Sequence, residues 1–307
     1  MMTSSNYTTR FYGVVLILIA TMAIVGCNKT VVPEMPSAEL PTYEVGTTYI
    51  YADGKRETVQ AVSSNTVTWV DNQGNVSSGP TDIIYPRAKW ETQTYVGERQ
   101  FTTRYNMFTE DRSSLWPLEE GNEFYFTEKG IWGGKNGTMK DYTVRWNCDV
   151  VGKERVKVLA GEFDTWVIRG RRFSPSMYRY ETKTWYYAPA IGLAVLEVRQ
   201  LTDKKKPILK ELVAVVPSTK NLPTEVHKAL TDNLQQALEF NKSGKSRVWT
   251  DATTGLSGST TPTGTFKLDD GTYCRNYTQN AFLKHGSRTY YGMACRNAKG
   301  HWITPQQ

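Results

Sequence analysis

Histidine, cysteine and long apolar runs are all scarce in this sequence. Its 307 residues include three histidines and four cysteines. The histidines His227, His285 and His301 stand in different segments, and neither Gly-x-Ser-x-Gly nor His-Glu-x-x-His occurs. Hydrolytic triads and zinc-dependent proteases need such groupings, so a catalytic triad is not expected. We predict that the protein is not an enzyme and that it binds no metal.

The longest apolar run, Phe11 to Val25, stands near the N-terminus. At about 15 residues it is short for a membrane span, which needs roughly 20, and it suits a signal peptide. The run ends in Gly26-Cys27, which resembles the lipobox of bacterial lipoproteins. That resemblance implies a signal peptide over residues 1–26, cleavage after Gly26, and N-acyl and S-diacylglycerol lipid on Cys27, with no other cofactor. The alternative is an uncleaved anchor with an inert Cys27.

The residues after Cys27 bear on where the protein is held. Asn28 follows the cysteine, where enteric lipoproteins kept in the inner membrane usually carry Asp, so by resemblance the outer membrane is favoured. The face of that membrane stays open. Residues 27–42 hold three prolines and no apolar periodicity. Because proline fixes φ and lacks an N–H, we expect a flexible, semi-extended tether that reaches up to ~50 Å.

Net charge is modest. Arg10 is the one charged residue removed with residues 1–26, so the 37 basic residues become 36 against 30 acidic ones, a balance of +6. This excess suits a surface that faces anionic lipid or wall polymer, and it gives little support to nucleic-acid binding. The densest basic run is Thr202 to Lys210. We interpret it as a solvated turn rather than a docking patch.

Alternating apolar and polar residues dominate residues 43–217, which is the signature of strands with one buried face. Between Asp141 and Val150 the alternation is continuous, and it predicts that Cys148 points into the core. Asp53-Gly54 and Gln73-Gly74 are hairpin signals. We therefore predict a mainly β (α+β) fold whose N-terminal part is an antiparallel curved sheet or half-barrel.

Two strand segments, VLAGEFDTWVI and TWYYAPAIGLAVLEV, resemble elements of uncharacterised β-rich periplasmic proteins. These are related in outline to lipoprotein carriers, whose half-barrels hold acyl chains. The resemblance allows Trp166, Trp185, Tyr186 and Tyr187 to line a cavity in a carrier or acceptor of an apolar ligand. Aromatic residues on alternating strands also form ordinary core, so both interpretations stay open.

Helical periodicity begins after Pro223. Apolar residues fall on one stripe and predict a helix from Thr224 to about Asn241. Short strands follow, with hairpin signals at Asp270-Gly271 and Lys284-His285-Gly286. We expect a small helix-plus-antiparallel-sheet domain over residues 223–303, joined to the first module by PSTKNL.

This second domain resembles the C-terminal domain of the bacterial 17 kDa outer-membrane surface-antigen family. The resemblance rests on LQQALE in the helix, then VW, TGLSGSTTPTGTF, DGTYCRNYTQ and YYGMACRNAKGHW. The glycine-zipper segment of other members does not precede it. The resemblance implies an envelope location and a surface or structural role without established catalysis.

Cys274 and Cys295 flank the Lys284-His285-Gly286 turn. A hairpin that turns between Lys284 and His285 places residues whose numbers sum to 569 opposite each other, and 274 plus 295 is 569. Facing Cβ atoms of a non-hydrogen-bonded pair lie about 4.5–5.5 Å apart, which suits a disulfide in an oxidising compartment. A metal site would need four donors and a redox pair would favour C-x-x-C; unpaired thiols are the remaining alternative.

The same strands alternate tyrosine and arginine, a pattern that can stack sugars or bind polymer, although one face must pack on the helix. We hypothesise a lipid-anchored protein with a non-catalytic structural or binding role. Its expected partners are the membrane and cell-wall polymer, lipopolysaccharide or another envelope protein. The candidate binding surface consists of Tyr273, Arg275, Tyr277, Tyr290, Tyr291 and Arg296.

Overall fold

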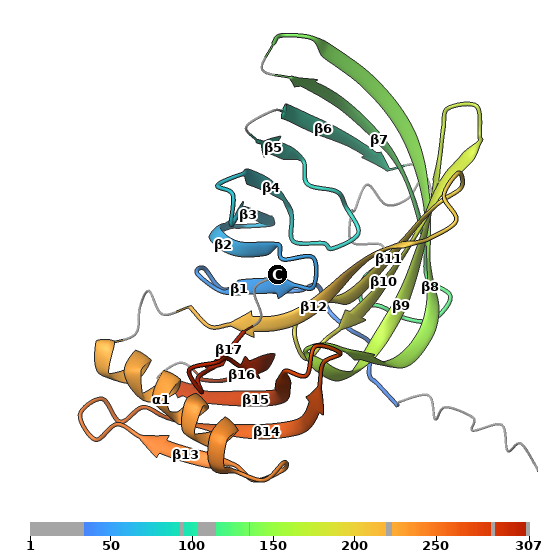
Figure 1. Ribbon diagram of the computed structural model, residues 1–307. Helices are drawn as coiled ribbons and strands as arrows, with labels where there is room; N and C mark the ends of the chain where they lie inside the picture. The colour runs from blue at the N-terminus through green and yellow to red at the C-terminus, as the bar shows by residue number, and fades with distance from the viewer. Residues whose placement is uncertain are drawn as a thin grey trace, which may run out of the picture. The chain divides into compact units, whose positions relative to one another are not determined.

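The computed structural model describes residues 34–92, 95–103, 115–134, 136–218, 223–283 and 286–304. Within these ranges the chain is mainly β with one helix (Figure 1). The first twelve strands are β1 (Thr48–Tyr51), β2 (Arg56–Ser63), β3 (Thr66–Asp71), β4 (Val76–Pro80), β5 (Lys89–Glu91), β6 (Tyr95–Thr103), β7 (Glu123–Gly134), β8 (Met139–Val158), β9 (Gly161–Phe173), β10 (Arg179–Ala188), β11 (Leu193–Leu201) and β12 (Ile208–Val216). None of the described helices is long and apolar enough to cross a membrane.

These twelve strands form a closed antiparallel ring. Each strand pairs with the next along the chain, and β1 pairs with β12 as well as with β2. Irregularities such as the one between Val150 and Gly152 add local bend. The predicted antiparallel curved sheet is confirmed, and its curvature continues to closure instead of stopping at a half-barrel.

Because consecutive strands are antiparallel, the two sets of turns lie at opposite ends of the ring. The turns after odd-numbered strands, such as those after β9 and β11, define what we call the hairpin end. Gly54 and Gly74 occupy two of these turns at φ 81° and 79°, a conformation that favours glycine. The connections after even-numbered strands define the plugged end, because apolar segments fill it.

The plug consists of the N-terminal segment and the described parts of the β4–β5 and β6–β7 loops. Ala38 pairs with Leu118, whose N–H donates to the Ala38 carbonyl at 2.8 Å, and Lys153 Nζ donates to the Met35 carbonyl at 2.6 Å. These segments bury their apolar side chains against inner residues of the ring. Residues 35–41 therefore belong to the folded body, which corrects the expected tether over residues 27–42. An extended proline-containing segment offers free carbonyls, and the ring and a plug loop supply their donors.

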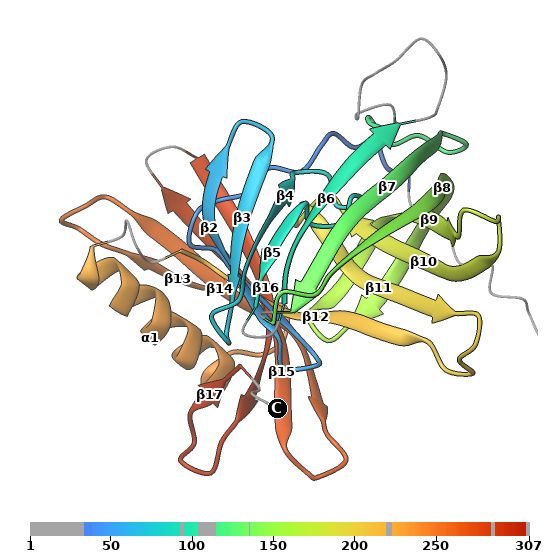
Figure 2. The same ribbon diagram turned by 90° about the horizontal axis from the view of Figure 1, so that it is seen from above.

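The C-terminal part is an antiparallel sheet with α1 (Thr224–Phe240) on one face (Figures 1 and 2). The helix buries apolar residues at helical spacing, namely Val226, Leu230, Ala237 and Leu238, and the predicted helix is confirmed. Its strands are β13 (Arg247–Thr250), β14 (Ser257–Lys267), β15 (Tyr273–Leu283), β16 (Gly286–Arg296) and β17 (Trp302–Ile303).

The other face of this sheet lies against the outside of the ring. Ala214 of β12 pairs with Gly292 of β16. A Cβ at position 292 would lie 2.7 Å from the Tyr277 hydroxyl oxygen and 3.1 Å from the Ala214 Cβ, so the approach requires glycine. Asn276 Nδ2 donates to the Leu159 carbonyl at 2.5 Å. The described residues of the two expected modules thus share a buried core.

Candidate functional site

The inner face of the ring carries a network of ion pairs. On β7, Glu128 follows Phe126 by two residues, so both project to the same face, and Phe126 belongs to the buried core. The charged residues of this face form a layer between the plug and the hairpin end. We call this layer the inner belt; it consists of Lys55, Glu57, Arg87, Arg99, Glu128, Arg172, Glu181, Lys183, Glu197, Arg199 and Lys210.

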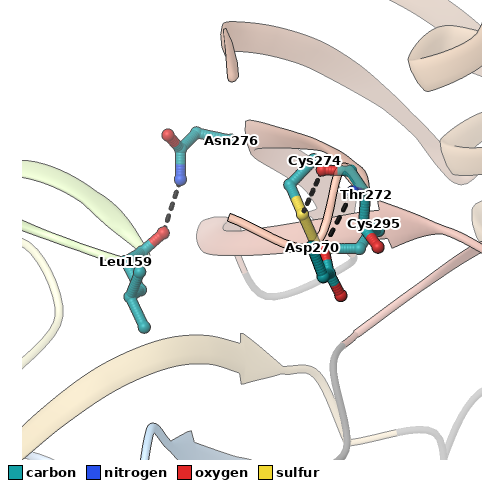
Figure 3. The surroundings of a disulfide bond; sticks show 6 residues. All are labelled: Leu159, Asp270, Thr272, Cys274, Asn276 and Cys295. Atoms are coloured by element: carbon teal, nitrogen blue, oxygen red, sulfur yellow. Dashed lines mark hydrogen bonds between the residues drawn. A yellow bond between two sulfur atoms is a disulfide. The ribbon is translucent and has the colours of Figure 1, made fainter. Parts of the chain in front are cut away.

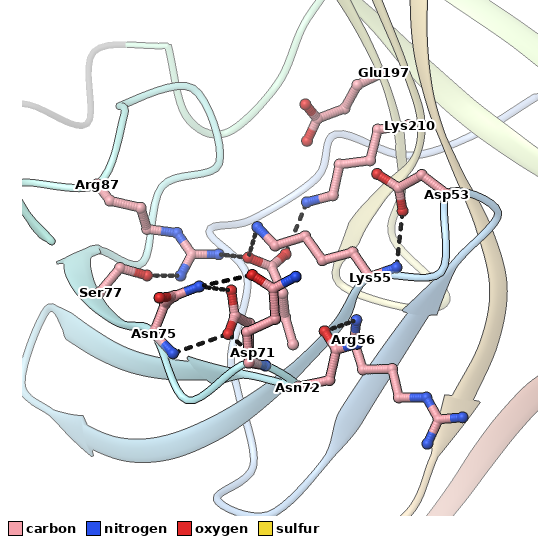
Figure 4. Close-up of polar contacts among 12 residues, drawn as sticks. Asp53, Lys55, Arg56, Asp71, Asn72, Asn75, Ser77, Arg87, Glu197 and Lys210 are labelled. Atoms are coloured by element: carbon pink, nitrogen blue, oxygen red, sulfur yellow. Dashed lines mark hydrogen bonds and ion pairs between the residues drawn. The ribbon is translucent and has the colours of Figure 1, made fainter. Parts of the chain in front are cut away.

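Glu57 is the carboxylate that Lys55, Arg87 and Lys210 share, and Figure 4 shows the charged ends of these three cations pointing toward one another. Its buried carboxylate accepts hydrogen bonds from Lys55 Nζ at 3.0 Å, Arg87 Nη2 at 3.2 Å and Lys210 Nζ at 2.8 Å. Burial alone would raise the pKa of Glu57, but the attraction of Lys210, Arg87 and Lys55 outweighs it and holds that pKa well below its usual range. Glu57 is therefore ionised at all pH values at which the protein would function.

Glu128 has the same role on the opposite side of the ring. Its buried carboxylate accepts from the Tyr142 hydroxyl and from Trp146 Nε1, each at 2.8 Å, and lies 2.9 Å from Arg99 Nε. The chain of pairs continues to Arg172, whose Nη2 lies 3.9 Å from Glu128. Four strands, β6 to β9, are linked through this one carboxylate.

Glu181 and Glu197 complete the belt. Glu181 accepts from Arg172 Nη1 at 3.2 Å and from Arg199 Nε at 2.7 Å, while Glu197 pairs with Lys183 at 2.6 Å. Burial would raise the pKa of each carboxyl, yet the arginine and lysine partners lower both values. Counting these groups gives seven cations and four carboxylates, 7 − 4 = +3.

Belt cations also lie over aromatic rings, which orients their charged ends. The distances to the ring centroids are 4.4 Å for Arg87 over Trp69, 4.3 Å for Arg99 over Trp90, 4.8 Å for Lys183 over Trp185 and 4.0 Å for Lys210 over Tyr51. Glu57, Glu128 and Glu181 are buried and Glu197 is partly buried, whereas these cations keep part of their side chains exposed. The belt therefore holds fixed positive charge that water reaches. The alternation in the sequence predicted these strands but not the belt, because all but one of its ion pairs join residues nine or more positions apart.

The cysteine hairpin was predicted from the sequence, and the structure contains it (Figure 3). Cys274 of β15 faces Cys295 of β16, their Cα atoms are 4.0 Å apart, and the sulfurs form a disulfide. The predicted register and disulfide are confirmed. Both cysteines are buried against Ile50 and Val213 of the ring. The disulfide thus fixes the part of the sheet that contacts the ring.

Most residues of the predicted tyrosine and arginine surface are buried or partly buried. Arg275, Tyr277 and Tyr290 are buried, and Arg275 Nη1 donates to the Leu238 carbonyl at 2.5 Å. Tyr291 packs edge-on against Phe163. This interpretation was wrong because α1 and the ring cover both faces of the hairpin. Of the six residues, Tyr273 is exposed, and Arg296 is exposed but paired with Glu239 at 2.9 Å.

The aromatic residues considered as a cavity lining are part of the packed core. Trp166, Trp185 and Tyr187 are buried in the cluster behind the plug, and Tyr186 is partly buried on the other face. Ordinary core is the interpretation that fits them. Cys148 is buried and free, as predicted from its strand, and burial raises the pKa of its thiol.

Histidines and carboxylates supply no metal centre in the described ranges, where no group of three His, Cys, Asp or Glu side chains is arranged to hold an ion. His227 and His301 are exposed, and His285 lies outside the described residues.

Asp82 is a buried carboxyl that no sequence pattern indicated. Its oxygens accept from the Ile84 N–H at 2.9 Å and from Trp116 Nε1 at 3.0 Å. Burial nevertheless raises its pKa to about 6, against the effect of these two hydrogen bonds. The protonation of Asp82 therefore changes near pH 6.

Comparison with known proteins concerns mainly the C-terminal part. Residues 236–303 match the family model of the 17 kDa outer membrane surface antigen. The 17 kDa surface antigens of Rickettsia bellii and Rickettsia felis are each 40% identical over 68 residues, and that of Rickettsia prowazekii is 38% identical. Each match covers 22% of this chain and 43% of the relative, so the chain spans less than half the length of these relatives.

One solved structure covers a larger share of the chain. The hypothetical lipoprotein YmcC from Escherichia coli (K12) aligns with a TM-score of 0.36 and 12% identity, over 59% of this chain and 90% of that one. A likeness at this level carries no argument about function. The identified relationship is therefore that residues 236–303 are similar to the 17 kDa surface-antigen family, as the motifs of the helix and the cysteine hairpin predicted.

Proposed function

We propose that this chain is a lipid-anchored lipoprotein of the bacterial outer membrane with a non-catalytic structural or binding role. The observation that carries the proposal is the match of residues 236–303 to a surface-antigen family, which supports an envelope protein. The Gly26-Cys27 sequence after the apolar run supports the anchor. The buried disulfide supports an oxidising compartment, where such bonds persist.

Acylation of Cys27 is tested by labelling cells with radioactive palmitate. We expect label in the wild-type protein, none in Cys27→Ser, and accumulation of the unprocessed precursor in that variant. Cys148→Ser is the matched control, since it also removes one thiol, and it should keep the label. Equal labelling of the wild type and Cys27→Ser would disprove the anchor, and density-gradient separation of the two membranes tests its location.

Transport of an apolar ligand in the ring is the second candidate, and it has less support. The aromatic residues expected to line its cavity are packed in the core, and the inner belt puts charges on the same face of the ring. An acyl chain gains nothing from such a lining. Saturable binding of one fluorescent fatty acid per chain would reinstate this candidate.

A further inference from the structure

Two neighbouring hairpins at the hairpin end expose large apolar side chains. Met177 and Tyr178, in the turn between β9 and β10, are 54% and 59% exposed. Ile208 and Leu209, at the start of β12, are 51% and 53% exposed. Four large apolar residues on two short turns exceed the scattered exposure that a protein surface normally shows.

The two turns form one surface. Their strands pair through β10 and β11, with Glu181 opposite Leu201. Beyond that pair, the Thr202 N–H donates to the Tyr180 carbonyl at 3.0 Å, and the Thr202 hydroxyl donates to the Arg179 carbonyl at 2.9 Å. Both views show the β9–β10 and β11–β12 turns reaching out on the same side of the ring (Figures 1 and 2).

Basic side chains surround these apolar residues. Arg179, Lys204, Lys205 and Lys206 are all exposed in the same two turns. Asp203 is the one acidic residue in the two turns, and it lies 3.5 Å from Lys204. The surface therefore carries four cations against one carboxylate. We call these cations, together with Met177, Tyr178, Ile208 and Leu209, the tip patch.

Exposed apolar residues beside lysines at the convex ends of hairpins match the chemistry of a lipid surface. The apolar ends enter the headgroup region, while the long stems of lysine and arginine keep their charges at the phosphates. A hairpin tip offers no concave pocket for a shaped protein partner, whereas a soft headgroup layer accepts single side chains. Anionic lipid adds an attraction that grows with each cation near the surface.

We propose that the tip patch docks on an anionic lipid bilayer. The run from Thr202 to Lys210, interpreted from sequence as a solvated turn, forms a turn over residues 202–207 and then enters β12. In this proposal its exposed apolar residues, together with those of the β9–β10 turn, make it a docking surface as well. This contact goes beyond the proposed function and does not depend on acyl chains at Cys27. It can therefore be tested in a chain that lacks them.

The test uses the full mature chain carrying Cys27→Ser in co-sedimentation with lipid vesicles. We expect binding to vesicles of phosphatidylethanolamine and phosphatidylglycerol at 3:1, and at least tenfold weaker binding to phosphatidylcholine vesicles. Raising the salt from 0.1 M to 0.5 M should weaken binding, because it screens the cations. Absence of binding to the anionic vesicles would overturn the proposal.

Variants distinguish vesicle binding through the tip patch from non-specific binding. Ile208→Ser with Leu209→Ser, and separately Lys204→Gln with Lys205→Gln, should each weaken binding at least tenfold. The matched control is Phe240→Ser with Val248→Ser, which removes two residues of 75% and 69% exposure from the C-terminal part. That control should bind like the parent. Equal binding by all variants, or equal loss in the control, would refute the assignment, and unchanged thermal unfolding confirms that each variant folds.

Discussion

At the scale of single residues, the two buried carboxyl groups of Glu57 and Asp82 have pKa values shifted in opposite directions. Glu57 is surrounded by three cations and stays ionised, whereas Asp82 has only an N–H from Ile84 and one from Trp116. Two neutral donors do not compensate a carboxylate for lost water, but three cations do. The same functional group is therefore a fixed charge in one place and a titrating group in the other.

Asp82 makes stability depend on pH. Its pKa is about 6 in the folded protein and lies near 3.8 when the chain is unfolded, so between these values the folded state binds more protons. The free energy of unfolding should fall as pH rises from about 4 to about 6, by roughly 3 kcal/mol at most, and then level off. Urea unfolding at pH 4, 5, 6 and 7 measures this, and Asp82→Asn should abolish that part of the profile.

Asp71→Asn is the control for Asp82. Slight burial would raise the pKa of Asp71, but hydrogen bonds from Asn75 and Gln73 lower it, so Asp71 contributes stability that is lost as pH falls. The Asp71 variant should keep the decline between pH 4 and pH 6. Parallel profiles for the wild type and Asp82→Asn would contradict the assignment of that decline to Asp82.

Cys148 should remain a free thiol while Cys274 and Cys295 are bonded. A buried thiol with a raised pKa forms little thiolate and reacts slowly. Peptide mapping by mass spectrometry without reduction should find a peptide linked through 274 and 295, and Cys148 should be alkylated only after denaturation. A link from Cys148 to either partner would contradict the register of the hairpin.

At the scale of elements, the belt ties strands together by charge instead of by apolar contact. Lys210 of β12 reaches Glu57 of β2 past the intervening β1, so the ion pair spans the place where the ring closes. A ladder of backbone bonds specifies neighbours only, whereas this pair joins strands that do not touch through their backbones. The belt therefore favours closure of the ring.

Glu57→Gln tests this role. The variant keeps the size of the side chain but leaves Lys55, Arg87 and Lys210 around a neutral amide, and breaking a buried pair in this way costs about 3 kcal/mol. Denaturant unfolding at pH 7 should show that loss. Asp164→Asn, which breaks the exposed pair with Arg155, should change stability little. Similar small effects of both variants would show that the belt contributes no stability.

The elements were largely predictable because their signals are local. Alternation predicted the strands around Cys148, the helical stripe predicted α1, and turn geometry predicted the register of Cys274 and Cys295. Closure of the ring depends on pairing Thr48 with Val216, which no local pattern encodes. The prediction of a tyrosine and arginine surface was wrong for the same reason. Alternation shows that a strand has two faces, but it does not show that the ring covers the face that α1 leaves open.

At the scale of the whole molecule, the expected boundary between residues 217 and 223 separates two parts that share a core. Cys274 and Met293 of the hairpin pack with Ile50 and Val213 of the ring, and Arg288 forms an ion pair with Glu44. Contacts of this kind are not broken by cutting the chain between the parts. The position of the boundary and the association of the parts are thus separate questions.

Limited trypsin digestion addresses both. From the sequence PSTKNL we expect the first cut near Lys220, and from the shared core we expect the two fragments to stay together in size-exclusion chromatography. Separation under native conditions would show that the shared core is too weak to hold them. An early cut between residues 140 and 200 would instead contradict the assignment of this region to the long, folded strands of the ring.

If the protein is lipid-anchored as proposed, its docked N-terminal segment limits the orientations it can take on the membrane. With acyl chains on Cys27 as proposed, the seven residue steps from Cys27 to Glu34, the first described residue, span at most about 25 Å. The Tyr187 hydroxyl donates to the Glu39 carbonyl at 3.4 Å, and nine residues of extended chain, about 30 Å, separate Tyr187 from Tyr178 in the tip patch. Because this connection is shorter than that stretch of strand, the anchor and the tip patch can meet one leaflet only if β10 is inclined to the membrane normal. A protein attached in this way reclines on its membrane instead of standing upright.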